Sequence, residues 1–229
     1  MYSFRTKQMS VPVITIDGPG GSGKGTIAMR LAQNLGWHYL DSGALYRIVA
    51  VVAMERAIEA DNEQALGELA EHLEFSLSFT GDDVATLLDG IRITPKLRSE
   101  EAGVFASNIA AVPAVRAALV QRQREFRKLP GLVAEGRDMG TVIFPDAKLK
   151  IFLTASVEAR ADRRYKQLKE KGENVNLSRL FRDIEKRDIR DMSRSISPLT
   201  PAQDAQLIDS TEMSIEMVLE EIHKLLEEN

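Results

Sequence analysis

The sequence predicts an α/β protein with a parallel five-stranded sheet flanked by helices on both faces. Short apolar runs that end in, or lead into, glycine, aspartate or threonine recur along the 229 residues, and they alternate with segments of helical periodicity. The first run leads directly into a glycine-rich turn and then into a helical segment. Strands that alternate with helices form parallel sheets covered on both faces, whereas one stretch of period-two alternation predicts a small antiparallel insert.

The strands of the main sheet are predicted from runs rich in β-branched and other apolar residues. Such residues suit a strand that is buried on both faces of a sheet. The five runs are Val13–Asp17, 37–40, Leu132–Gly136, Leu149–Thr154 and Gln206–Asp209.

The helices are predicted from apolar residues at three- and four-residue spacing and from their end signals. Gly36 ends the first helix, Ser42 is the predicted N-cap of the second, and Pro113 lies in the first turn of another. The predicted helices are Lys24–Leu35, 44–57, 64–72, 99–110, 113–128, 157–171, 177–192 and 214–226.

The segment 61–94 differs from the rest of the chain. Apolar residues alternate with polar ones over 74–80, turn signals follow at 81–83, and a second strand returns over 84–88. Another turn at 89–90 precedes a possible third strand. This pattern predicts an inserted antiparallel subdomain.

Composition limits the function classes. The chain is 44% hydrophobic and 28% charged, as in a globular protein with one main core, and its formal net charge of −4 argues against nucleic acid or an anionic membrane as a partner. The absence of cysteine excludes disulfides and thiolate metal sites. Residues 1–10 lack the apolar segment of a secretory signal, and the apolar stretch 48–54 is too short to span a bilayer. We therefore expect a cytoplasmic protein.

The glycine-rich turn after the first strand predicts a phosphate cradle. Backbone N–H groups of such a loop, and of the helix that follows it, point at phosphates, and a lysine adds a mobile positive charge. The eighth position of the motif holds Gly25 where Ser or Thr usually ligates Mg²⁺, and Thr26 follows it, so the Mg²⁺ ligands stay open. The loop residues are Gly18, Pro19, Gly20, Gly21, Ser22, Gly23, Lys24, Gly25 and Thr26.

Polar residues also follow the predicted strand Leu132–Gly136. Because ligands gather at the carboxyl ends of parallel strands, Arg137 is expected to bind a second phosphate and Asp138 to accept a hydrogen bond from a substrate. A surface ion pair is the alternative interpretation. Glu135 follows three apolar residues and could order Mg²⁺ directly or through water, or serve capping or packing.

Two later helices each carry cationic residues on one face. Spacing of three and four residues places Arg160, Arg163, Arg164 and Gln167 together, and likewise Arg187, Arg190, Asp191 and Arg194. Such faces are often solvated and laced with pairs such as Asp183–Arg187. Beside a phosphate cradle in an acidic protein, they instead favour phosphoryl transfer, which needs positive charge around the moving group, under a mobile helical lid that excludes water.

In combination, four motifs resemble those of bacterial cytidylate kinases, which are nucleoside monophosphate kinases. They are IDGPGGSGKGT at 16–26, LDSGALYR at 40–47, GRDMGTVIFPD at 136–146 and RDIRDMSR at 187–194, and the resemblance covers nearly the whole chain from Ile14. The GKGT variant of the phosphate loop is usual among nucleoside monophosphate kinases. Glu135 stands where the family pattern leads us to expect aspartate.

The resemblance implies a P-loop nucleotide kinase fold and an activity. The enzyme would transfer the γ-phosphoryl group of ATP to CMP or dCMP with Mg²⁺, giving CDP or dCDP in pyrimidine nucleotide metabolism, and would act as a monomer. The implied core comprises 11–41 and 132–229, with a lid at about 160–172. The implied CMP-binding region is 42–131, with the insert at about 61–107.

The resemblance also implies the site residues. Arg47 and Arg137 would hold the acceptor phosphate, and Arg187 and Asp191 would lie near the ribose. Ser107, Asp138 and Arg194 would read the cytosine edge, whose amino donor suits an acid and whose acceptors suit Arg and Ser. The remaining implied acceptor contacts are Ser42, Tyr46 and Arg116, and the implied catalytic set is Lys24, Arg137, Arg160, Arg164 and Arg187.

Two other functions stay open at this point. One is a related P-loop kinase with a different acceptor, which acceptor preference would distinguish. The other is a nucleotide-binding switch or a nucleic-acid-associated NTPase. A switch should hydrolyse ATP slowly, without stimulation by any monophosphate.

Overall fold

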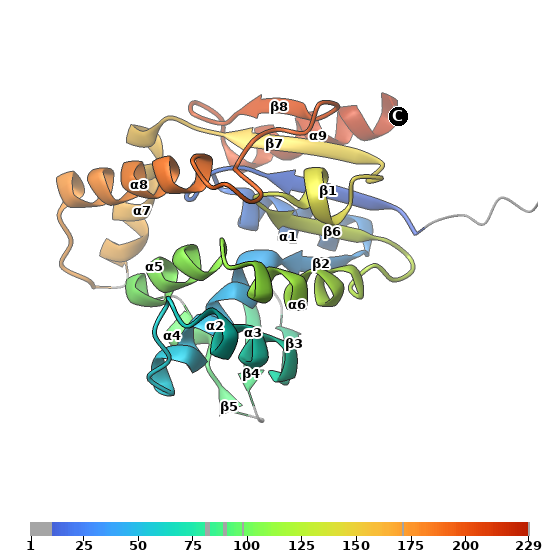
Figure 1. Cartoon of the computed structure of the whole chain (residues 1–229). Helices are drawn as coiled ribbons and strands as arrows, with labels where there is room; N and C mark the ends of the chain where they lie inside the picture. Colours follow the sequence, from blue (N-terminus) through green and yellow to red (C-terminus); the bar gives the residue numbers. More distant parts are fainter. Residues whose placement is uncertain (1–10, 81–82, 89–90, 98, 171, 229) are drawn as a thin grey trace, which may run out of the picture.

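The computed structural model describes residues 11–228 except 81–82, 89–90, 98 and 171 (Figure 1). The predicted turns at 81–83 and 89–90 therefore lie outside the described residues, apart from Asp83, as does the segment 1–10. Within the described residues no single helix is long and apolar enough to cross a membrane; α5 (Glu100–Ile109) and α6 (Pro113–Arg124) pass that test only as a pair bent by 101°.

The main sheet has five parallel strands, as predicted. Its spatial order is β2-β6-β1-β7-β8. The strands are β1 (Val13–Asp17), β2 (His38–Asp41), β6 (Leu132–Gly136), β7 (Leu149–Thr154) and β8 (Gln206–Asp209). In register, Asp17 lies opposite Gly136 on β6 and opposite Phe152 on β7. The carboxyl ends of these central strands therefore meet at one edge, where ligands gather in open α/β sheets.

Helices cover both faces of this sheet (Figure 1). Alternation along β1 sends Val13 into the core on one face and Ile14 into the core on the other. The first core includes residues of α2 (Ser42–Glu55), α3 (Glu63–His72), α5 and α6. The second includes residues of α1 (Lys24–Leu35) and α9 (Ile215–Glu228).

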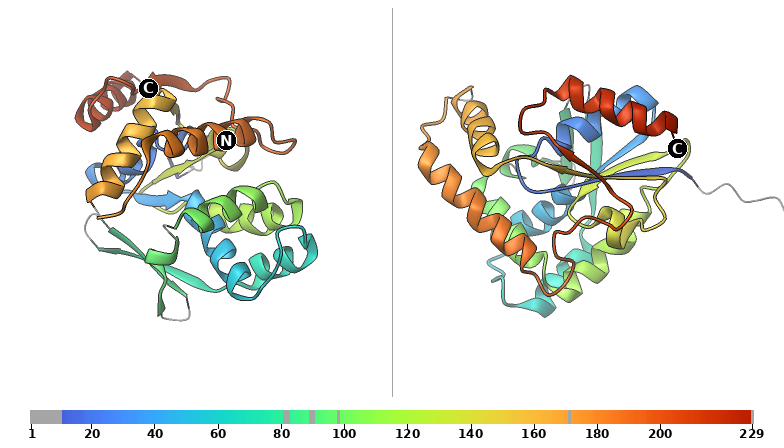
Figure 2. Two further views of the ribbon diagram at one scale, coloured as in Figure 1. Left: turned by 90° about the vertical axis from the view of Figure 1, so that its left-hand side faces the viewer. Right: turned by 90° about the horizontal axis from the view of Figure 1, so that it is seen from above.

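The predicted insert forms a separate three-stranded sheet in the order β3-β4-β5. Its strands are β3 (Phe75–Thr80), β4 (Asp83–Leu88) and β5 (Ile91–Arg92), and they pair antiparallel. Two further helices, α7 (Val157–Glu170) and α8 (Leu177–Met192), lie side by side at one end of the molecule (Figure 2). The lid predicted at 160–172 falls on α7 and Gly172, with residue 171 outside the described residues, and its movement stays a prediction.

Three local features differ from the sequence expectation. Helix α2 begins at Ser42, and its N-cap is Asp41, whose carboxylate accepts a hydrogen bond from the Ala44 N–H at 3.0 Å; the prediction that Ser42 is the cap is wrong because the extended backbone of Asp41 places a better acceptor there. The short helix α4 (Thr94–Leu97) and a π-helix, η1 (Met139–Ile143), were not predicted.

Candidate active site

The glycine-rich loop lies at the carboxyl end of β1. A Cβ on Gly18 would stand 2.0 Å from the carbonyl oxygen of Leu153, so this close approach to β7 requires glycine. Gly23 adopts the left-handed conformation with φ of 93° and precedes α1, whose N-terminus has no side-chain cap. Uncapped N–H groups at a helix N-terminus are the donors that bind phosphate.

Side chains from distant elements hold the carbonyl oxygens of this loop. Arg160 Nη1 donates to Gly20 O at 3.0 Å, and Arg163 Nη1 donates to Ser22 O at 3.2 Å. The Ser210 hydroxyl also donates to Ser22 O, at 3.2 Å. These contacts fix the loop against α7 and the segment after β8. The helical spacing had grouped Arg163 with Arg160, but no sequence signal pointed to Ser210.

Arg160 is a buried residue. Its side chain is 3% exposed, its Nη1 lies 3.1 Å from Oδ1 of Asp188 on α8, and its Nε donates to Ala155 O at 2.9 Å. In this structure Arg160 therefore contacts the loop backbone and a buried acid. A direct role for Arg160 on the phosphates stays a prediction.

Lys24, the first residue of α1, faces Glu135 near the end of β6. Lys24 Nζ lies 3.4 Å from Glu135 Oε2, and the Tyr39 hydroxyl donates to Glu135 Oε1 at 3.5 Å. Burial raises the pKa of Glu135 to about 7; Lys24 opposes this shift and Asp41 adds to it. Burial also lowers the pKa of Lys24, and the positive charges of neighbouring arginines lower it further.

Arginines from several elements gather around the loop and Lys24. A Cβ on Gly20 would lie 3.6 Å from Arg137 Nη2 and 3.7 Å from Arg187 Nη1, so both guanidinium groups stand over the loop. Burial lowers the pKa of Arg187 to about 10, with further lowering by Arg137, Arg47 and Arg194. Burial, together with Arg164 and Arg137, likewise lowers the pKa of Arg47. Cations that repel one another in this way favour a bound anion.

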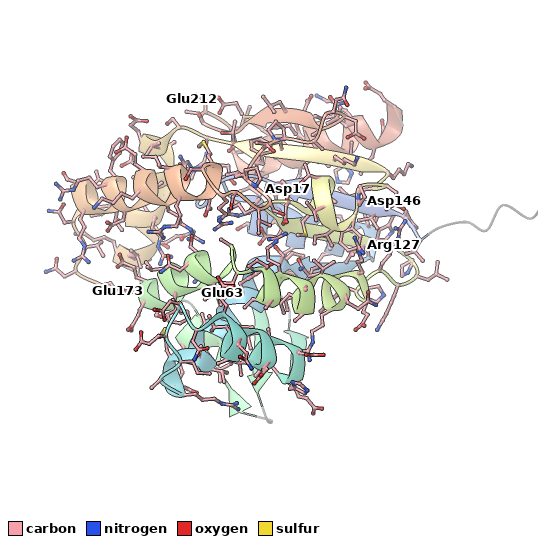
Figure 3. The ribbon with its side chains drawn as sticks, viewed as in Figure 1. Asp17, Glu63, Arg127, Asp146, Glu173 and Glu212 are labelled. Atoms are coloured by element: carbon pink, nitrogen blue, oxygen red, sulfur yellow. The ribbon has the colours of Figure 1, made fainter. Side chains whose placement is uncertain are left out.

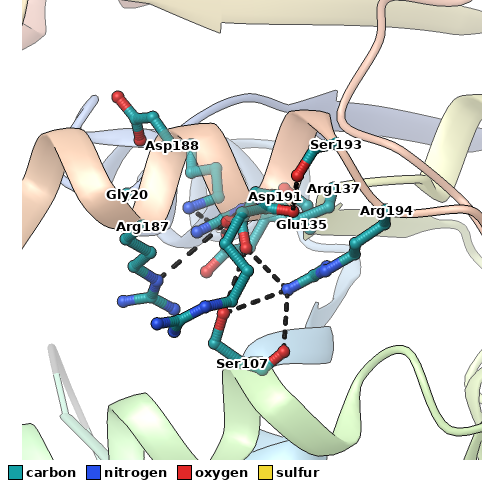
Figure 4. A network of polar contacts seen from close by, with 12 residues as sticks. Gly20, Ser107, Glu135, Arg137, Arg187, Asp188, Asp191, Ser193 and Arg194 are labelled. Carbon is teal, nitrogen blue, oxygen red and sulfur yellow. Dashed lines mark hydrogen bonds and ion pairs between the residues drawn. The ribbon is translucent and has the colours of Figure 1, made fainter.

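Asp191 on α8 is the centre of a polar network (Figure 4). Its Oδ2 accepts from Arg137 Nε at 2.9 Å, and its Oδ1 accepts from Arg194 Nη2 at 2.6 Å and from the Ser107 hydroxyl at 3.1 Å. Burial alone would raise the pKa of Asp191, but Arg137, Arg194 and Arg187 together lower it. The network joins the turn after β6, α5, and the end of α8. In the described part of the chain, the buried Nε atoms of Arg187 and Arg194 have no hydrogen-bond partner.

A second group forms around Asp138. Arg116 on α6 makes a buried ion pair with Oδ2 of Asp138, and its Nη1 donates to the Tyr46 hydroxyl at 3.4 Å. Burial raises the pKa of Tyr46 to about 12. The structure therefore brings Tyr46, Arg116 and Asp138 together, and Arg116 occupies one oxygen of the acid predicted to read the base.

Two more predicted residues lie at the edges of the site. A Cβ on Gly136 would stand 2.4 Å from the Ser42 hydroxyl oxygen, which places Ser42 against the end of β6. Arg47 Nη1 donates to Leu97 O at 2.6 Å, so α4 orients this arginine. No group of three or more His, Asp or Glu side chains within the described residues could hold a metal ion.

Comparison with known proteins identifies the family. A family model described as cytidylate kinase matches residues 14–228. The chain belongs to the cytidylate kinase family. A cytidylate kinase of Stutzerimonas stutzeri (strain A1501) is 56% identical over 214 residues, which cover 93% of each chain. One from Klebsiella pneumoniae (strain 342) is 52% identical over 211 residues, covering 92% of this chain and 93% of that one.

Membership of the cytidylate kinase family confirms the resemblance given by the four motifs. The chain is an enzyme, a nucleoside monophosphate kinase, and the parallel sheet with its glycine-rich loop is the P-loop nucleotide-binding fold expected of it. The roles of individual site residues stay predictions.

Proposed function

We propose that this kinase transfers the γ-phosphoryl group of ATP directly, in line, to CMP and dCMP. Family membership supports CMP as the acceptor and ATP as the donor. The observation that carries the proposal is the group of mutually repelling cations over the glycine-rich loop, where Arg137 and Arg187 flank Gly20. Phosphoryl transfer needs positive charge at this place because its transition state spreads charge over the equatorial oxygens.

The donor phosphates would lie in the loop 18–26, with Lys24 on the outer phosphates. The acceptor phosphate would contact Arg47 and Arg137. The ribose would lie near Arg187 and Asp191. With both substrates held this way, transfer runs on positioning and electrostatics and needs no covalent enzyme intermediate. Closure of α7, with Arg160 and Arg164, would exclude water from the reaction.

Cytosine would be read by Ser107, Asp138 and Arg194. The cytosine amine is a donor that suits Asp138, and its ring acceptors suit the Ser107 hydroxyl and Arg194. Because Arg116 holds Oδ2 of Asp138, the ion pair orients the acid toward the base through its other oxygen. Uracil would place a carbonyl against this carboxylate, so CMP should be strongly preferred.

Mg²⁺ fits the carboxylates at the strand ends. Glu135 is a buried acid beside Lys24, and Asp41 lies close enough to raise its pKa. Mg²⁺ bound to nucleotide keeps several waters and needs only one or two carboxylates besides the phosphates. Glu135 and Asp41 would hold it, directly or through water, and it would neutralise charge on the phosphates.

The proposal extends to the setting of the enzyme. We place it in pyrimidine nucleotide metabolism in the cytoplasm, acting as a monomer without nucleic-acid or membrane partners. The formal net charge of −4 and the absence of cysteine are compatible with that setting.

Tracing the phosphoryl group tests the reaction. With ATP labelled at the γ-phosphate, Mg²⁺ and CMP, the label should appear in CDP, with little labelled inorganic phosphate. The matched reaction without CMP should release almost no label. Labelled inorganic phosphate formed at the same rate with and without CMP would contradict the proposal and favour a nucleotide switch.

A further inference from the structure

Asp17 is a buried carboxylate that the proposed reaction does not use. It ends β1 (Figure 3), directly before Gly18 of the phosphate loop, and it is 5% exposed. Its Oδ1 accepts a hydrogen bond from the Met139 N–H at 2.9 Å, and its Oδ2 accepts one from the Gly140 N–H at 2.8 Å. Each oxygen of one acid is therefore committed to a backbone N–H far away in the sequence.

These two N–H groups begin the π-helix η1. Its N-cap residue is Asp138, yet the Asp138 side chain makes no cap hydrogen bond. Aspartate at an N-cap ordinarily accepts from the N–H groups that follow it. Here Asp17 accepts the hydrogen bonds from those donors. The Asp138 carboxylate makes none of them and pairs with Arg116 at the site instead.

Asp17 also holds the other end of the turn between β6 and η1, through its place in the sheet. In the sheet, Asp17 is the register partner of Gly136, the last residue of β6. The dipeptide Arg137-Asp138 lies between Gly136 and Met139. It is therefore held on one side by the β-ladder at Asp17 and on the other by the Asp17 carboxylate.

We infer that Asp17 is a positioning residue that sets substrate specificity: by holding both ends of the turn, it fixes Arg137 and Asp138 relative to the phosphate loop. This inference rests on the proposed function, in which Asp138 reads cytosine. A rigid link is useful here because the base reader must be held at a set distance from the donor phosphates.

The environment of Asp17 is consistent with this role. Burial raises the pKa of Asp17 to about 6, and the charge of Asp138 raises it further. Hydrogen bonds from the Gly140 and Met139 N–H groups and the charge of Arg137 act in the opposite direction. The acid is therefore mainly ionised at neutral pH, and both oxygens accept. Asparagine has nearly the same shape but offers only one oxygen, and its amide nitrogen would face a donor.

The test uses the full-length chain with Asp17→Asn and, as a matched control, Asp146→Asn. Asp146 also accepts two hydrogen bonds, from Arg127, but its side chain is 60% exposed and it belongs to no part of the site. In the nucleotide-free protein, amide hydrogen exchange at Met139 and Gly140 should rise about tenfold or more in Asp17→Asn, because one of the two hydrogen bonds that Asp17 accepts from these N–H groups is lost. Asp146→Asn should leave it unchanged.

The kinetic readout separates positioning from general loss of structure. The ratio of kcat/KM for CMP to that for UMP should fall about tenfold or more in Asp17→Asn, because displacing a reading group by about 1 Å is costly. The KM for ATP should change by less than about twofold, since the loop carbonyls keep their own contacts. A merely structural role would lower kcat for both acceptors and leave their ratio unchanged.

A second variant covers the case in which Asp17→Asn does not fold. A Cβ on Gly140 would lie 2.9 Å from Thr15 Oγ1, so in Gly140→Ala either the Thr15 side chain or the start of η1 must shift while Asp17 stays intact. Where amide exchange at Met139 and Gly140 rises in this variant, the same loss of CMP preference is expected. Unchanged amide exchange in Asp17→Asn, or an unchanged preference in variants whose exchange has risen, would overturn the positioning role. The proposed function would still stand if Asp138→Ala removed the preference, whereas a wild type with no preference for CMP over UMP would overturn both.

Discussion

Lys24 Nζ lies 3.4 Å from Glu135 Oε2, so the lysine of the phosphate loop is tied to an acid near the end of the neighbouring strand β6. Glu135 is buried and the Lys24 side chain is largely buried, and burial shifts both pKa values toward the uncharged forms. Nucleotide phosphates would give Lys24 a second anionic partner, and Mg²⁺ would give Glu135 a cationic one. The pair would therefore link the donor site to the proposed Mg²⁺ site.

Replacement of Lys24 should harm transfer to every acceptor. Lys24→Ala should lower kcat about 100- to 1,000-fold, the usual cost of losing one preorganised charge at a developing transition state. Because Lys24 pairs with Glu135 and not with any of the three residues that we propose read the base, the ratio of CMP to UMP use should stay within about twofold of the wild type. Steady-state ADP release with each acceptor measures both quantities. Loss confined to one acceptor would contradict the assigned role.

Replacement of Asp138 should act on the acceptor. Asp138→Ala removes the acid that we propose faces the cytosine amine, so kcat/KM for CMP should fall about 10- to 100-fold, since a hydrogen bond to a charged group contributes about 1.5–3 kcal/mol. ATP binding, measured by calorimetry, should change little. The variant also leaves Arg116 without its buried partner. Arg116→Ala, which breaks the same ion pair but keeps the acid, is therefore the matched control. Equal loss with all acceptors in Asp138→Ala would contradict base reading.

The Arg160–Asp188 pair should contribute mainly to stability and loop geometry. Removing one partner leaves an uncompensated buried charge, so Arg160→Ala or Asp188→Ala should lower the free energy of unfolding by about 3–5 kcal/mol. The double variant Arg160→Met with Asp188→Leu should recover much of that loss. Denaturant unfolding measures all three. Single variants as stable as wild type, with kcat alone reduced, would instead support direct action of Arg160 on phosphate.

Glu135 should make stability depend on pH in a defined direction. Its pKa in the folded protein is about 7, above the ordinary value of 4.5, so the folded state binds this proton more tightly than the unfolded chain. The stabilisation is complete below about pH 4.5 and is lost as pH rises to about 7. The unfolding free energy of the wild type should therefore decline relative to Glu135→Gln across this interval. A difference that is constant with pH would contradict the raised pKa.

Local signals were sufficient for the main sheet and the phosphate loop. The apolar run Val13–Asp17 predicts a strand, and Gly36 predicts the end of the helix before it. The structure confirms both, as β1 and as the C-terminus of α1. The π-helix was not predictable in this way. Its first N–H groups are bonded by Asp17, which lies 122 and 123 residues earlier in the sequence. Only the folded sheet brings these groups together.

The site, too, has some features that local sequence predicts and others that only the tertiary structure determines. Helical spacing correctly put Arg160 and Arg163 on one face, but it could not show that they bind the carbonyl oxygens of Gly20 and Ser22. Their anionic and hydroxyl partners, Asp188 and Ser210, come from other elements. Asp188 belongs to the motif at 187–194, but nothing in that motif shows that it pairs with Arg160, and no motif marks Ser210. The sequence therefore predicts which charges gather at the site, and tertiary structure decides which of them are already paired.

The most direct test of the account is ADP release from Mg·ATP with CMP, dCMP, UMP, AMP and GMP supplied separately. The charges over the phosphate loop and the base-reading group of Ser107, Asp138 and Arg194 predict fast turnover with CMP and dCMP, weak turnover with UMP, and almost none with the purines. Equal turnover with all five would contradict the account, because the loop would then bind ATP without any selection of the acceptor.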